Sequence, residues 1–275
     1  MSDGASAIEG WINKLETFGV TCPTCGHQLY RPKVLSRQTG QKMAGACLSC
    51  GYKQPPTEKA GKTKKAPQLE AEGRKNRTIG YYLKYSVWAN DSLMSKDFRN
   101  FATDTPGQKE LLYYGHGVAE QIVRGQTVHA LLYGNVGVGK SHIANGILVQ
   151  IQVDSKWTKT TMFVDWQMLM SRRKAGMHDG HDDVRAQMDA VMTEIGKADV
   201  VVIDDLGAER GSDYDVDLAN EVFRLREDKS VIVTTNMGGS ALKARYGDLT
   251  ISRMAAHGQG NSYAVKNISD QRREK

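Results

Sequence analysis

One eight-residue run constrains the fold of this chain more than any other feature. It matches the phosphate-loop pattern G-x-x-x-x-G-K-S/T at every fixed position. Its residues are Gly134, Asn135, Val136, Gly137, Val138, Gly139, Lys140 and Ser141. An apolar run at residues 128–133 precedes it, and apolar residues at helical spacing follow it. The sequence therefore predicts a strand, a loop and a helix in the order that a nucleotide-binding loop requires.

The residue types in this loop suit a triphosphate with its metal ion. Glycines allow a tight turn that aims backbone N–H groups at phosphate oxygens, and the following helix adds the positive end of its dipole. We expect Lys140 to reach the β- and γ-phosphates and the Ser141 hydroxyl to bind Mg²⁺. ATP and Mg²⁺ are therefore the predicted cofactors of this part of the chain.

Three further apolar runs read as strands, at residues 160–164, 199–203 and 231–234. The second ends in Asp204 and Asp205, which predicts that Asp204 holds hydrated Mg²⁺ and that Asp205 orients or deprotonates water. The third is followed by Asn236, whose amide is suited to hold the attacking water. Thr105 and Pro106 predict the start of a helix that runs to about residue 123. Alternating strands and helices predict an α/β fold with a parallel sheet and a site at the carboxyl ends of the strands.

The four cysteines form two pairs with zinc-ligand spacing: Cys22, Cys25, Cys47 and Cys50. Two residues between thiolates let each pair take two corners of a tetrahedron, and a glycine follows each pair. The 21 residues between the pairs slightly exceed the usual window. We interpret the pattern as a structural Zn²⁺ site in a zinc-ribbon-like module, in preference to disulfides or a redox pair. His27 is an alternative ligand, but an exposed position beside the site fits it better.

These features divide the chain into three parts. Residues 1–52 form the cysteine module with an amphipathic helix at about residues 6–18, and residues 53–77 form a basic flexible linker. Residues 78–275 form the nucleotide-binding domain. The net charge of +6 is concentrated in the linker, which is compatible with a nucleic-acid partner or with a solvated tether. No membrane-spanning run or signal peptide is predicted, so we expect a cytoplasmic protein with no membrane partner.

The order of these motifs resembles that of the AAA+ ATPases. Gly139 to His142, Ile203 to Gly207, Thr235-Asn236 and Ile251 to Met254 are similar to the motifs of bacterial helicase loaders of the DnaC/DnaI type and their IstB transposition-helper relatives. The resemblance covers about residues 95–275 and implies a P-loop AAA+ core of about five strands. Some forty residues follow Asn236, which leaves little or no helical lid. Part of each nucleotide pocket is then expected to come from a neighbouring copy.

Further roles follow from the resemblance alone. It implies that Arg253 is an arginine finger that completes a neighbour's site, with Arg245 as the competing candidate. It implies that Arg272 is a sensor arginine, with Arg273 as the alternative. His142 belongs to the family's nucleotide-binding motif. Phe98 and Phe101 resemble aromatic residues near the adenine, although core phenylalanines would look the same. Asp205 stands where many members have glutamate.

The segment between residues 164 and 197 resembles a helical insertion that contacts single-stranded DNA in initiators and loaders. Arg172, Arg173 and Lys174 would there neutralise phosphates, which makes binding salt-dependent. A solvated helix end is an equal alternative for each of the three. A polar loop is favoured over a metal site for the following group of residues: His178, Asp179, His181 and Asp182.

Three functional hypotheses follow. The first is an ATP-dependent replication protein that loads a hexameric replicative helicase onto single-stranded DNA, as a homo-oligomer joined through its ATP sites. The hydrolysis of ATP is expected to be weak and stimulated by DNA. The second is an IstB-type transposition helper that acts on duplex DNA. The third is a zinc-ribbon nucleic-acid-binding protein in which ATP serves as a switch with little turnover.

Overall fold

The computed structural model of the protein describes residues 14–36, 40–55, 66–177, 180–209 and 211–270. The chain forms two compact units, residues 1–64 and 65–275. The first unit contains an antiparallel pair of strands, β1 (Leu15–Thr21) and β2 (Gln28–Pro32). The start of the predicted helix at residues 6–18 lies outside the described residues. Its end was predicted wrongly, because Leu15 and Phe18 belong to β1, where pairing with β2 overrides their helical spacing.

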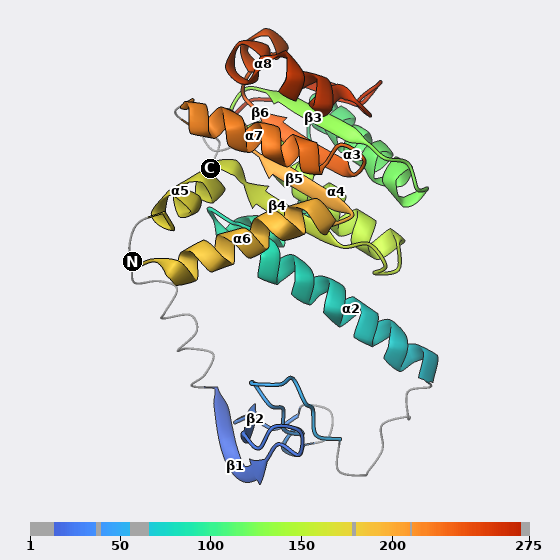
Figure 1. Cartoon of the computed structure of the whole chain (residues 1–275). Helices are drawn as coiled ribbons and strands as arrows, with labels where there is room; N and C mark the ends of the chain where they lie inside the picture. Colours follow the sequence, from blue (N-terminus) through green and yellow to red (C-terminus); the bar gives the residue numbers. More distant parts are fainter. Residues whose placement is uncertain (1–13, 37–39, 56–65, 178–179, 210, 271–275) are drawn as a thin grey trace. The chain divides into compact units, whose positions relative to one another are not determined.

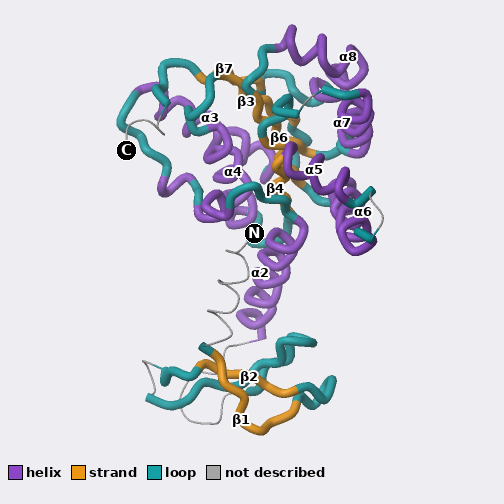
Figure 2. The backbone as a smooth tube through the Cα atoms, turned by 90° about the vertical axis from the view of Figure 1, so that its left-hand side faces the viewer, coloured by secondary structure: helices purple, strands orange, loops and turns teal. Residues whose placement is uncertain are grey.

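The second unit contains a five-stranded parallel sheet with the order β4-β5-β6-β3-β7, of which Figure 1 labels the first four strands and Figure 2 labels β7. The strands are β3 (His129–Gly134), β4 (Thr161–Asp165), β5 (Val200–Asp204), β6 (Ser230–Thr235) and β7 (Ser262–Val265). The first four confirm the predicted strands. The fifth has a mixed polar and apolar sequence, and its pairing with β3 makes it a strand. The prediction of an α/β fold with a parallel sheet is confirmed.

Two helical layers cover the sheet (Figure 2). One layer consists of α3 (Pro106–Val123) and α4 (Lys140–Asp154), which pack on strand residues such as Leu132 and Val202. The other consists of α5 (Trp166–Ala175), α6 (Asp182–Lys197), α7 (Asp213–Leu225) and α8 (Gly239–Ala255). These helices pack on the alternate strand residues, such as Val201 and Val233. Because successive side chains of a strand point to opposite faces, each apolar strand supplies both cores.

Helix α2 (Ala66–Tyr85) corrects the predicted linker, since residues 66–77 are helical. Pro67 lies at the start of the helix, where a missing N–H costs nothing. The last turns of the helix are anchored by aromatic side chains. Tyr82 lies in one core, and the hydroxyl of Tyr81 donates to Glu194 Oε2 over 2.8 Å. This helix was not predicted from the sequence, because only its last turns contact the rest of the unit through apolar side chains. Among the described residues, no helix is long and apolar enough to cross a membrane.

Arg226 joins several elements at the amino-terminal edge of the sheet. The side chain is fully buried. Its guanidinium donates to the carbonyl oxygens of Ile195, Ala198, Asp199 and Ser230. Burial lowers the pKa of Arg226 to about 10, so the group keeps its charge at neutral pH. One buried cation therefore holds the start of β5, the start of β6 and the end of α6 together.

We expect Arg226→Met to lower the free energy of unfolding by about 3 kcal/mol, because four carbonyl oxygens lose their donor. The matched control is Arg224→Met in the last turn of α7, two residues before Arg226. The Arg224 side chain is exposed, so the variant should change stability by less than about 0.5 kcal/mol. Urea unfolding, followed by tryptophan fluorescence, measures both. Equal stability of the two variants would contradict the assigned role.

Candidate functional site

The predicted phosphate loop forms a tight turn between β3 and α4. Gly137 has φ 79° and Gly139 has φ 91°, values in the left-handed region that glycine adopts without strain. Helix α4 begins at Lys140, so its first N–H groups point toward the space in front of the loop. The side chain of Val138 is buried in the core and that of Val136 is exposed. At these two positions only the backbone is available to a phosphate.

Lys140 is buried, and three oxygen atoms hold its ammonium in place. Its Nζ donates to the carbonyl oxygen of Gly134 over 2.9 Å and to that of Asn135 over 2.6 Å. It also donates to Oδ1 of Asn236 over 2.7 Å. The two carbonyl contacts fold the lysine side chain back over its own loop, and the third connects the loop to the end of β6.

The acidic pair lies at the carboxyl end of β5. Asp204 is buried, and its Oδ1 accepts a hydrogen bond of 2.6 Å from the hydroxyl of Thr234 on β6. The hydroxyl of Ser141 lies near the same carboxylate, where it acts to lower the pKa of Asp204. The phosphate-loop serine and the first carboxylate therefore meet, as Mg²⁺ binding requires. The next residue, Asp205, has φ 57°, and its backbone N–H donates to the Thr234 hydroxyl over 2.9 Å.

The electrostatics of this edge suit a cation. Burial raises the pKa of Asp204 to about 6, and the nearby carboxylates of Asp165 and Asp205 act in the same direction. Hydrogen bonds from Thr234 and Ser141 oppose that rise. The Ser141 hydroxyl and the Asp204 carboxylate supply oxygen ligands of the kind that Mg²⁺ prefers. These residues fit the ion, which would offset the carboxylate charge and screen bound phosphates.

Asn236 connects the two halves of the site. Its Oδ1 accepts from Lys140, and its Nδ2 donates to Oδ1 of Asp205 over 2.7 Å. The side chain is exposed, so it lies at the mouth of the site. The structure thus brings together four of the predicted residues: Lys140, Asp204, Asp205 and Asn236.

Sequence reasoning missed two residues of this edge. Asp165 ends β4 opposite Asp204 in the sheet register, and its Oδ1 caps α5 by accepting from the N–H of Met168 over 2.7 Å. Thr234 contacts both acidic residues. A polar residue at the end of each apolar strand was the available signal, but the register that aligns these residues is not visible in the sequence.

The C-terminal segment, residues 265–270, lies against the phosphate loop. A Cβ atom added to Gly134 would lie 2.6 Å from the carbonyl oxygen of Val265, and one added to Gly137 would lie 1.8 Å from Oδ1 of Asp270. Gly134 is therefore required by close backbone packing, while Gly137 is required by its left-handed φ and lies beside the Asp270 side chain. Arg272 and Arg273, the sensor candidates, lie outside the described residues.

The aromatic candidates occupy different surroundings. Phe101 touches the phosphate loop, because a Cβ at Gly139 would lie 2.7 Å from its ring. Phe98 packs between α3 and α4, with its ring centroid 4.4 Å from that of His116. His142 faces the same segment, and its Nε2 lies 2.9 Å from the carbonyl oxygen of Asp97. Burial lowers the pKa of His142, which favours the neutral ring.

The two arginine-finger candidates lie at opposite ends of the strands, Arg253 at the amino ends and Arg245 at the carboxyl ends. The backbone carbonyl of Arg253 lies 2.9 Å from Nδ1 of His129, at the start of β3. A strand of six residues places this about 17 Å from the phosphate loop. The guanidinium of Arg253 donates to Oδ1 of Asn220. Arg245 instead contacts the loop that follows Asp205.

The predicted DNA-contacting residues lie on α5, and two of them have acidic partners. Arg173 lies 3.6 Å from a carboxylate oxygen of Asp189, and Lys174 lies 2.8 Å from one of Asp215. Arg172 is half-buried. The Lys174 side chain retains 47% of its exposure. These partners on α6 and α7 neutralise part of the predicted basic cluster.

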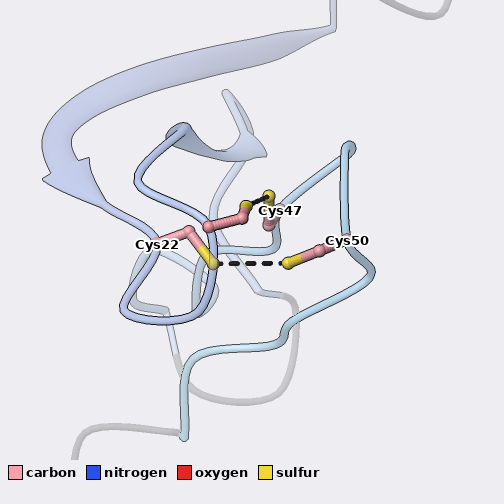
Figure 3. Close-up of side chains that lie close together, drawn as sticks. Cys22, Cys47 and Cys50 are labelled. Carbon is pink, nitrogen blue, oxygen red and sulfur yellow. Dashed lines mark hydrogen bonds between the residues drawn. The ribbon is translucent and has the colours of Figure 1, made fainter.

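The four cysteines of the first unit form one cluster (Figure 3). All four sulfur atoms lie within 4.8 Å of one another. The Sγ atoms of Cys22 and Cys50 are 3.4 Å apart, and those of Cys25 and Cys47 are 3.5 Å apart. These separations exceed a disulfide bond by more than 1 Å and approach the edge of a tetrahedron with Zn–S bonds of about 2.3 Å. The donor set therefore fits Zn²⁺.

Both cysteine pairs have the same backbone. Gly26 has φ 75° and donates to the carbonyl of Cys22 over 2.9 Å, and Gly51 has φ 77° and donates to that of Cys47 over 3.0 Å. This repeated turn presents both sulfur atoms of a pair on one side. His27 is exposed. Among the described residues, these cysteines are the one group in which three or more Cys, His, Asp or Glu side chains bring their ligand atoms together, while His178 and Asp179 lie outside the described part.

Comparison with known proteins agrees with this geometry. The family model described as IstB-like ATP binding protein matches residues 69–256. Comparison with curated proteins gave no match. The crystal structure of the DnaC helicase loader has a TM-score of 0.52 at 22% identity, over 64% of this chain and 100% of that chain. The DnaI structure has a TM-score of 0.51 at 16% identity, over 68% and 96%.

A putative primosome component from Streptococcus pyogenes serotype M3 has a TM-score of 0.52 at 14% identity, over 70% of this chain and 98% of that chain. At such identities these three structures establish a shared fold. The family model covers more than half of the chain, including the phosphate loop, both acidic residues and Asn236. The chain belongs to the family of IstB-like ATP-binding proteins.

Proposed function

We propose that this protein is an ATP-hydrolysing loader that places a hexameric replicative helicase on single-stranded DNA. The observation that carries the ATPase part is the chain of contacts from Lys140 through Asn236 to Asp205. Bound ATP·Mg²⁺ would replace the carbonyl partners of Lys140 with phosphate oxygens. Asp205 and Asn236 would then hold the attacking water against the γ-phosphate.

The nucleotide site is completed by a second copy of the chain in this proposal. Arg253 lies at the sheet edge opposite its own phosphate loop, so its guanidinium can serve only a neighbour's ATP. Release from Asn220 and from the carboxylate of Glu227, 3.8 Å away, would free it for the γ-phosphate, where a fixed charge stabilises the transition state. Arg272 serves as the sensor arginine of the same site, and hydrolysis ends the complex with the helicase.

The loading part is supported by the fold shared with the DnaC and DnaI structures and by the separate cysteine unit. That unit, once it holds Zn²⁺, displays exposed apolar side chains that its small core does not use. They are Val34, Leu35, Met43 and Leu48. Exposed apolar groups on a stable module suit a protein partner. We assign them to the contact with the helicase.

Single-stranded DNA is the second proposed partner, through Arg172, Arg173 and Lys174 of α5. Lys174 is the most accessible of the three, and its ammonium also lies 5.5 Å from the ring centre of Tyr214. Phosphate contacts of this kind weaken as salt rises. ATP binding and DNA binding are expected to support each other, because α5 directly follows Asp165 at the nucleotide edge.

We expect the double variant Val34→Ser, Leu35→Ser to weaken binding to the host helicase by at least about 10-fold, because buried apolar anchors carry most interface energy. The matched control, Val153→Ser with Leu249→Ser, removes exposed apolar groups from the other unit and should bind normally. Helicase, ATP and forked DNA are then mixed with each protein, and unwinding is followed. Loading by the first variant at the control's rate would contradict the assignment.

The match to the IstB-like family model favours a second candidate, a transposition helper that acts with a transposase. The two candidates share the ATPase and differ in the DNA that they bind. Titration with single-stranded and duplex DNA of equal length separates them. Preference for duplex DNA, with no retention of the helicase, would favour the helper.

A further inference from the structure

The loop that carries Asp205 is held from one side by β6. The backbone N–H of Leu206 donates to the carbonyl of Thr234 over 2.9 Å, and the hydroxyl of Thr235 donates to the carbonyl of Leu206 over 2.6 Å. Asp205 itself has φ 57°, in the left-handed region that few residues other than glycine, asparagine and aspartate adopt. Such a conformation persists only when its surroundings fix it.

The other side of this loop is held by the first half of α8. The guanidinium of Arg245 donates through one nitrogen to the carbonyl oxygens of Gly207 and Glu209, over 3.0 and 2.7 Å. The same nitrogen lies 3.3 Å from Oε1 of Glu209. These contacts place a fixed cation under the turn that begins at Asp205.

Glu209 lies within the loop and adds a second set of contacts. We call Arg245 and Glu209, with their contacts to this loop, the clamp. The Glu209 side chain is 3% exposed, and its Oε2 accepts the backbone N–H of Gly207 over 3.0 Å. Its Oε1 accepts the hydroxyl of Tyr246, the neighbour of Arg245. Burial raises the pKa of Tyr246, so this hydroxyl remains a donor at neutral pH. A buried carboxylate with these donors is a costly arrangement that needs each partner.

The position of Arg245 also indicates that it serves the ATP site of its own subunit and not that of a neighbouring subunit. Its partners belong to the loop after β5, at the same sheet edge as the phosphate loop of its own chain. Arg253 lies at the other edge, in the half of α8 beyond Gly247, where the helix is interrupted at φ 77° and ψ 169°. The two halves of α8 therefore present their arginines to different sites.

We propose that Arg245 and Glu209 form a positioning pair that acts within one subunit and holds the Asp205 carboxylate in its place for hydrolysis. This inference rests on the proposed ATPase function. Arg245 does not touch the nucleotide. It acts through the loop, so ATP binding, which depends on Lys140, stays intact when the clamp is removed, and turnover falls.

The first test is the kinetics of Arg245→Gln and Glu209→Gln. We expect kcat to fall about 100-fold, the effect of a displacement of about 1 Å, while the Kd of ATP changes less than about threefold. Arg245→Lys keeps one donor and should recover part of the loss. The matched control is Lys243→Gln on the same helix. Lys243 forms an exposed ion pair with Asp248, and its loss should leave kcat and the Kd of ATP unchanged. Unchanged kcat, or a loss of ATP binding equal to the loss of kcat, overturns the proposal.

Mixed oligomers test the action within one subunit. Arg245→Gln is mixed with Lys140→Ala, which keeps Arg245 but has a defective ATP site. If Arg245 served a neighbour, interfaces between the two variants would regain activity, up to about one quarter of wild type at equal amounts. We expect no gain. Arg253→Gln mixed with Lys140→Ala is the positive control, in which activity should return.

Hydrogen exchange separates this inference from the proposed function. The amides of Leu206 and Gly207 should lose protection at least about 10-fold in Arg245→Gln and keep it in Lys243→Gln. This readout needs neither turnover nor oligomers. If wild-type protein hydrolyses no ATP, the proposed ATPase function is wrong. If the Arg253 mixture stays inactive, the proposed completion of the site by a neighbouring copy is wrong. Unchanged protection of the two amides overturns the clamp in either case.

Discussion

Lys140→Ala should weaken the binding of ATP by at least about 100-fold, which makes it one of the two largest effects expected for this chain. The lysine is buried, and its ammonium is already fixed by three oxygen atoms at the mouth of the phosphate loop. A charge fixed in this way contributes a strong, charge-assisted bond to each phosphate that replaces a carbonyl. Fluorescence titration with a labelled ATP analogue measures the change.

The variant Asp205→Asn provides the contrast. Asparagine is isosteric with aspartate, tolerates φ 57°, and can still accept the hydrogen bond from Asn236. The fold and ATP binding should therefore persist, while turnover falls about 100- to 1,000-fold because the amide cannot take up a proton. Retention of ATP binding by Lys140→Ala, or normal turnover by Asp205→Asn, would remove the basis for the proposed site.

The predictable parts of the fold are those whose signals are local. Helix α3 begins where the sequence predicts, because Thr105 and Gln108 exchange hydrogen bonds between side chain and backbone as a capping box. The buried strands have long apolar runs that fit burial on both faces. The phosphate loop and the cysteine pairs have fixed spacings, which predict their chemistry directly.

The parts that were missed depend on contacts between distant segments. β7 is a strand because it pairs with β3, and the end of α2 is fixed by aromatic contacts with β4 and α6. Asp165 joins the acidic edge only because β4 and β5 pair in register. The clamp around Glu209 brings together groups 36 and 37 residues apart in the sequence. A single sequence has no local pattern that reports such pairings.

Removal of Zn²⁺ should unfold the first unit and leave the second folded. Apart from the metal site, the described core of the first unit is small: Leu29 is buried, and Phe18, Val20 and Tyr52 are partly buried against it and the cysteines. A core of this size does not stabilise a module by itself. A structural zinc site supplies about 10 kcal/mol or more of folding free energy. Chelation should therefore abolish the protected amides of residues 15–36 and 40–54 while ATP binding continues.

Single variants identify the ligands. Cys50→Ser should lower the zinc content, measured by mass spectrometry of the intact protein, from one ion per chain to a minor fraction. His27→Ala should keep one ion, because His27 is exposed and its Nδ1 lies 3.2 Å from the carbonyl oxygen of Cys25. Substitution with Co²⁺ adds a spectroscopic test, since four thiolates give a characteristic absorption.

Chelation and reduction, compared side by side, distinguish a metal site from a disulfide-bonded module. Sulfur atoms 3.4 to 3.5 Å apart are not joined by a disulfide bond. Bound Zn²⁺ would shield them, so the native protein should react with a thiol reagent only after chelation. A reducing agent should leave the module folded, because Zn²⁺ binding requires thiolates. If reduction unfolded the first unit and chelation did not, the cysteines would be disulfides. The apolar side chains assigned to the helicase contact would then be displayed by a covalently closed module.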